Sequence, residues 1–115
     1  MLPVAHRLHD SADFFAVLRS RHSGRSGSDL LVILVCATGS EPVRVGLVVS
    51  KTVGNAVVRN RTIRVLRHLM AARLAQLPVG VTFVIRAKPA AVNISSDRLG
   101  VELDQLIVRA VTAMK

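Results

Sequence analysis

The sequence predicts an α+β domain in which helices cover one small sheet in a two-layer arrangement. Its apolar residues alternate between helical spacing and short β-rich runs, in the order helix, strand, strand, helix, strand, helix. Half of the residues are hydrophobic and a fifth are charged, which is too apolar for a disordered chain and too interrupted for a membrane span. A length of 115 residues provides for one hydrophobic core. We therefore expect a single domain over residues 1–115.

The N-terminal part predicts a short helix and then a loop. Asp10 or Ser11 can cap a helix that runs to about residue 20. Residues 20–28 are rich in serine and glycine, which is typical of a flexible loop. The segment Gly24-Arg-Ser-Gly27 has the form of the backbone-clamping loop of KH domains, but that loop joins two helices. A strand is expected to follow here, so a flexible connector is favoured.

Three runs predict strands. Residues 30–37 are β-rich and too short for a core helix, and residues 43–50 follow after a turn. We interpret these two as an antiparallel hairpin. Residues 81–86 form the third strand, after Pro78 and Gly80.

Two longer helices complete the fold. Asn55 can cap a helix that extends to about Gln76, and Ser95 or Ser96 can open the last helix. The last helix carries one apolar stripe, made of Leu99, Leu103, Leu106 and Ala110.

The positive charge is concentrated in the middle of the chain. The net charge is +9 and the pI is about 11.7. No carboxylate occurs between residues 42 and 96, and this stretch holds nine bases, namely Arg44, Lys51, Arg59, Arg61, Arg64, Arg67, Arg73, Arg86 and Lys88. Such a charge favours a polyanion as the partner. The alternative is a surface charged only for solubility, but such surfaces usually mix both signs.

The long helix is predicted to have an apolar face and a basic face. The inner face contains Val58, Thr62, Val65, Leu66, Leu69 and Ala72. The outward face contains Asn60, Arg64 and Arg67, extended by Arg61 and His68, with Arg59 at its border.

The basic face is suited to phosphate, because guanidinium groups bind two phosphate oxygens at once and a helix N-terminus adds donors and positive charge. A solvated basic helix normally interleaves glutamate, and this one has none. An acidic protein or anionic lipid is an alternative partner, but lipid would require the apolar face that the core needs.

Other residue combinations give weaker signals. Cys36 has no neighbouring base to activate it, and His6 and His9 lack further metal ligands. The seven acids form no cluster of the kind that protein nucleases use. We therefore expect no catalytic or metal-binding residue in this chain. With three phenylalanines as the only aromatic residues, an RRM-like stacking sheet is not expected.

The longest apolar run has eight residues, where about 20 would be needed to cross a bilayer. The N-terminus also lacks the basic-then-apolar order of a signal peptide. We expect a soluble, cytoplasmic protein.

The segment from Val48 to Arg67 resembles the signature of the bacterial ribonuclease P protein family. It contains Ser50-Lys51-x-x-Gly54-x-Ala56-Val57, followed by the hallmark Arg59-Asn60-Arg61. The similarity extends to Asp13-Phe14 near the start and to Ile85-Arg86-Ala87 after the third strand. Thr52 and Ile63 stand where this family often has basic residues.

The resemblance implies a small α/β sandwich with a mainly antiparallel sheet and the basic helix in a left-handed βαβ crossover. It also implies a subunit of an endoribonuclease that removes the 5′ leader from precursor tRNA. In that family the catalyst is the RNA, which uses Mg²⁺, and the protein has no organic cofactor. The partners would be ribonuclease P RNA and the precursor tRNA leader.

Matching positions imply that the RNA-binding residues are Lys51, Arg59, Asn60, Arg61, Arg64 and Arg67. Phe14 would line the cleft for the single-stranded leader, and Leu18 and Leu34 occupy positions where the family often has aromatic cleft residues. One rival is a general RNA-binding or ribosomal-type protein with a similar fold. Another is a nuclease that works without RNA.

Overall fold

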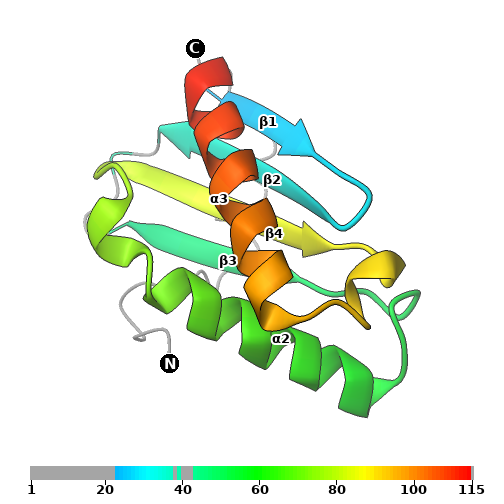
Figure 1. The fold of residues 1–115 in the computed structure, drawn as a ribbon. Helices are drawn as coiled ribbons and strands as arrows, with labels where there is room; N and C mark the ends of the chain where they lie inside the picture. Colours follow the sequence, from blue (N-terminus) through cyan, green and yellow to red (C-terminus); the bar gives the residue numbers. More distant parts are fainter. Residues whose placement is uncertain (1–22, 38, 40–42, 115) are drawn as a thin grey trace.

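The structure is a computed structural model that describes residues 23–37, 39 and 43–114 (Figure 1). The predicted helix over residues 10–20 lies outside these residues, as do Phe14, Leu18 and the two histidines at positions 6 and 9. The described chain forms four strands and two α-helices, which are β1 (Ser23–Gly27), β2 (Leu31–Ala37), β3 (Arg44–Val48), α2 (Ala56–Ala71), β4 (Val81–Ala87) and α3 (Ser96–Ala113).

The four strands make one sheet in the order β1-β2-β4-β3. β2 pairs antiparallel with both β1 and β4, whereas β3 runs parallel to β4. The predicted hairpin between residues 30–37 and 43–50 is therefore wrong, because β4 lies between these two strands. Val81 through Ile85 are all buried, and a strand that is apolar on both faces belongs in the interior of a sheet.

The prediction of a loop over residues 20–28 is also wrong, because Ser23–Gly27 forms the edge strand β1. Its small residues allow α3 to pack closely. A Cβ atom on Gly24 would overlap the backbone carbonyl of Ala110, and the Ser26 hydroxyl donates a hydrogen bond to the Leu106 carbonyl at 2.6 Å. The glycine and serine residues that predict a flexible connector instead allow close packing of α3 against β1.

The segment β3–α2–β4 is a crossover between parallel neighbouring strands. Seen from the helix side, both strands run left to right in Figure 1 and β4 lies above β3, so the crossover is left-handed. This handedness is rare in βαβ units. It confirms what the family resemblance implies.

Both described helices lie on one face of the sheet and bury the main core there. The predicted stripe on α3 is confirmed, since Leu99, Leu103, Leu106 and Ala110 are all buried. None of the helices among the described residues is long and apolar enough to span a membrane.

On α2, the predicted inner face is confirmed at Thr62 and Leu66, which are buried, and Val58, Val65 and Leu69 are half-buried. Two details are wrong. The helix ends at Ala71 rather than near Gln76, although a 3₁₀ turn at Leu74–Gln76 follows. Consequently Ala72 is exposed as the cap residue, and Met70 takes the buried position in the last turn.

Candidate nucleic-acid interface

Helix α2 begins where its cap predicts. The side-chain oxygen of Asn55 accepts a hydrogen bond from the Val58 amide at 3.0 Å, and the helix has no acidic residue in its first turn. The amides of the first turn have no partners within the helix and give this end a partial positive charge. The N-terminus of α2 is therefore suited to an anion.

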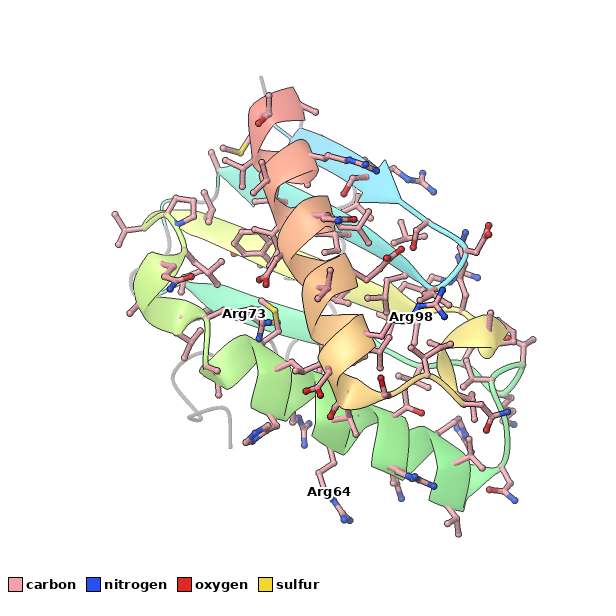
Figure 2. The ribbon with its side chains drawn as sticks, viewed as in Figure 1. Arg64, Arg73 and Arg98 are labelled. Atoms are coloured by element: carbon pink, nitrogen blue, oxygen red, sulfur yellow. The ribbon has the colours of Figure 1, made fainter. Side chains whose placement is uncertain are left out.

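The outward face of α2 borders a hollow of about 580 Å³. Asn60, Arg64 and His68 are exposed beside it, and Arg67 and Ile63 are half-buried. Figure 2 shows Arg64 extending from α2 away from the sheet. The structure thus brings Asn60, Arg64 and Arg67 together, as the helical spacing predicts.

From the sequence, Ile63 stands out only as a departure from the family pattern. Its spacing of three residues from Asn60 and four from Arg67 already places it in the same row on the helix. The hollow therefore combines an apolar side chain with two guanidinium groups.

The other predicted RNA-binding residues surround this face without joining the hollow. Arg61 is exposed and borders a second hollow of about 200 Å³, formed with the segment that leads into α3. Lys51 is exposed in the turn before α2. Arg59 is half-buried, and its Nε atom is buried without a hydrogen-bond partner among the residues that the structure describes.

Within the part of the chain that the structure describes, the one ion pair joins Arg73 to Asp104 at 2.6 Å. The outward arginines at positions 61, 64 and 67 have no carboxylate partner among these residues. Their positive charge is therefore uncompensated by nearby carboxylates of the described chain, which is the condition for attracting a polyanion.

Leu34 lies on the opposite face of the sheet from α2 and α3. There it packs beside Cys36, Val84 and Val48 in a small apolar cluster separate from the main core. Leu34 is half-buried, and in the strand register it pairs with Arg25, which is exposed on β1. Of the three predicted leader-cleft residues, only Leu34 is described, and it is not among the residues that line the hollow at α2.

The described residues include no group of three or more histidine, cysteine, aspartate or glutamate side chains that could hold a metal ion. The thiol of Cys36 is fully buried.

Comparison with known proteins gives a consistent result. The family model described as Ribonuclease P matches residues 2–111. The chain is 42% identical over 110 residues to the ribonuclease P protein component of a Nocardioides species, covering 95% of this chain and 94% of that protein. It is 46% identical over 110 residues to the corresponding protein of Acidothermus cellulolyticus, covering 95% and 91%.

Two solved structures have a similar fold. The Staphylococcus aureus RNase P protein superposes with a TM-score of 0.80 at 20% identity, covering 96% of this chain and 98% of that one. The RNase P protein from Thermotoga maritima superposes with a TM-score of 0.77 at 20% identity, covering 89% and 96%.

Proposed function

Because the chain belongs to the ribonuclease P protein family, we propose that it acts as the RNA-binding subunit of ribonuclease P in the cytoplasm. In this proposal the catalytic RNA cleaves the 5′ leader from precursor tRNA, and the protein binds both RNAs. The observation that carries the proposal is the outward face of α2, where the described chain supplies guanidinium groups and no pairing carboxylate.

The contribution of α2 is electrostatic. Arg61 and Arg64 are exposed and can each present a planar pair of donors to phosphate oxygens. Lys51 precedes the helix N-terminus, which adds unpaired amides. Placing these groups between two RNA backbones reduces the repulsion between precursor tRNA and catalytic RNA, and so tightens substrate binding.

Magnesium enters this proposal as a cofactor of the RNA. Mg²⁺ prefers carboxylate, phosphate and water oxygens, whereas the described residues around the two hollows at α2 are arginine, asparagine, histidine, hydroxyl-bearing and apolar side chains. These residues do not fit a Mg²⁺ site. By neutralising phosphates, the arginines would lower the Mg²⁺ concentration that the holoenzyme needs.

The leader would lie in a cleft lined by Phe14, Leu18 and Leu34. What supports this assignment is the position of Leu34 in an apolar cluster with Arg25 beside it in the register. An apolar surface next to an exposed cation suits a single strand, whose bases and phosphates need different contacts. Leu34 cannot stack on a base as an aromatic ring does, so this position would contribute little base preference.

Reconstitution tests the proposal. The protein is added to a bacterial ribonuclease P RNA at a Mg²⁺ concentration at which the RNA alone is nearly inactive, and cleavage of precursor tRNA is measured. We expect cleavage to appear with the protein present and to be absent with the protein alone. No gain from the protein would favour a general RNA-binding protein, which the relatives do not favour. Cleavage by the protein without RNA would indicate a nuclease.

A further inference from the structure

Arg73 belongs to the basic stretch by sequence but lies just beyond α2, in a different setting from the arginines of that helix. Its Nε donates to one carboxylate oxygen of Asp104 at 2.6 Å, and one terminal nitrogen reaches the other oxygen at 3.3 Å. The side chain of Arg73 is 18% exposed. In Figure 2 it lies between α2 and α3, whereas Arg64 points away from both.

The same guanidinium also ends α2. In a continuing α-helix the Leu69 carbonyl would accept a hydrogen bond from the Arg73 amide. Here that amide donates to the Met70 carbonyl at 3.0 Å instead, and a terminal nitrogen of the Arg73 side chain donates to the Leu69 carbonyl at 2.7 Å. Arg73 therefore caps the helix that it terminates.

A further bond connects Arg73 to the backbone of α3. A terminal nitrogen lies 3.3 Å from the Gly100 carbonyl, and a Cβ atom at position 100 would lie 2.9 Å from that nitrogen. The absence of a side chain at Gly100 makes room for the guanidinium. Arg73 thus contacts α3 at both a side chain and the backbone.

Helix α3 is itself fixed to the sheet at its other end. The Ser26 hydroxyl of β1 bonds the Leu106 carbonyl, and Gly24 allows close contact with Ala110. Helix α2, in contrast, lies along the β3 edge of the sheet (Figure 1). The bonds of Arg73 therefore connect the end of α2 to a helix whose C-terminal half is held against β1.

We propose that Arg73 and Asp104 form a positioning pair that fixes the C-terminal end of α2 and thereby the direction of its RNA-facing arginines. This inference rests on the proposed RNA-binding function. Arg73 acts in it through the orientation of Arg64 and Arg67, without contacting RNA.

The test uses two substitutions that change the charge in opposite directions. Arg73→Ala and Asp104→Ala, their double variant and wild type are compared for affinity to ribonuclease P RNA over a salt series, at a temperature where circular dichroism shows all of them folded. Positioning predicts that both single variants lose affinity by about three- to tenfold and that the double variant loses no more than either. It also predicts an unchanged salt slope, because Arg64 and Arg67 still contact phosphate in the complex and the affinity is lost to the cost of ordering α2 on binding.

Two other outcomes would overturn the inference. If Arg73 binds phosphate directly, Arg73→Ala lowers the salt slope by about one and Asp104→Ala strengthens binding, since a negative charge is removed. If the pair serves only stability, the melting temperatures fall while the affinities of the folded variants equal that of wild type. Arg109→Ala is the control for a lost charge, because Arg109 is exposed on α3.

A conservative variant keeps the test usable if Arg73→Ala fails to fold. Arg73→Lys retains the charge, but one ammonium cannot serve Asp104, Leu69 and Gly100 in the same geometry. Positioning therefore predicts that Arg73→Lys also loses affinity with an unchanged slope, and wild-type affinity for this variant contradicts it. Failure of the proposed function looks different, because then wild type itself shows no salt-dependent affinity for the RNA.

Discussion

At the scale of single residues, the arginines in and just beyond α2 show that burial and partners decide the role of a side chain. Arg73 is mostly buried and holds Asp104. Arg61 and Arg64 are exposed, and Arg67 is half-buried beside the larger hollow. From the sequence, all four are arginines within one predicted helix. Helical spacing separates Arg64 and Arg67 from the core, but the pairing of Arg73 depends on α3, which lies some 30 residues further along the chain.

Arg64→Ala and Arg67→Ala test the phosphate contacts one at a time. Each substitution is expected to weaken RNA binding to a similar extent across RNA sequences and to lower the salt slope by about one unit. The measurement is a binding titration over a range of salt concentrations. Arg109→Ala, also exposed, serves as the matched control. Slopes that stay at the wild-type value for both variants would refute the assignment.

Phe14→Ala and Leu34→Ala test the leader cleft. Contact with the leader predicts an affinity loss that grows with leader length while thermal stability stays unchanged. The measurement combines binding of precursor tRNAs with graded leaders and a thermal melt. A lower melting temperature with no dependence on leader length would show that the side chain only packs in the core.

Gly24→Ala tests the close approach of α3 to β1. The added methyl group would overlap the Ala110 carbonyl, a backbone atom that can move only if the helix moves. We expect a loss of unfolding free energy of about 2 kcal/mol or more, measured by urea denaturation. Gly39→Ala is a useful comparison, because Gly39 has open space around its Cβ position but a φ of 73°, so any cost there comes from backbone strain alone.

At the scale of elements, α2 depends on its first turn. Asn55→Ala removes the side-chain acceptor for the Val58 amide and is expected to lower the unfolding free energy by about 1 kcal/mol. Asn55→Asp keeps the acceptor and is expected to preserve stability, but its negative charge would weaken RNA binding. Denaturant titrations and RNA titrations on both variants measure the two effects separately. Equal RNA affinity for Asn55→Asp and wild type would contradict an RNA contact at this end.

The helices were more predictable than the sheet because their signals are local. Asn55 and Ser95 both accept hydrogen bonds as cap residues at the predicted starts, and the stripe on α3 follows from spacing alone. The early end of α2 is not predictable from local spacing, since Arg73 there bonds the Leu69 carbonyl and the backbone of the distant α3.

Strand pairing was less predictable, because it is a property of the whole sheet. The β-rich run predicts a strand over residues 30–37, but the neighbours of this strand are β1 and β4 rather than β3. The composition of β1 predicts a loop, since glycine and serine usually mark turns, whereas here the small residues make room for α3. The left-handed crossover followed from the family resemblance and from no feature of the periodicity.

At the scale of the whole molecule, folding largely preserves the separation of charge along the chain. The carboxylate-free stretch contains β3, α2 and β4. Among the described acids, Asp104 returns to pair with a base of this stretch, and that base is Arg73. The outward arginines of α2 have no carboxylate partner among the described residues. Part of the net charge of +9 is therefore concentrated on one side of this helix.

A comparison of two double variants with equal net charge tests this account most directly. One carries alanine at Arg61 and Arg64, and the other carries alanine at the exposed residues Arg98 and Arg109. The measurement is the salt dependence of affinity for ribonuclease P RNA. If α2 binds the phosphates, the slope falls by about two units in the first variant and stays near the wild-type value in the second. Equal slopes for the two variants would show that total charge, rather than the face of α2, drives binding.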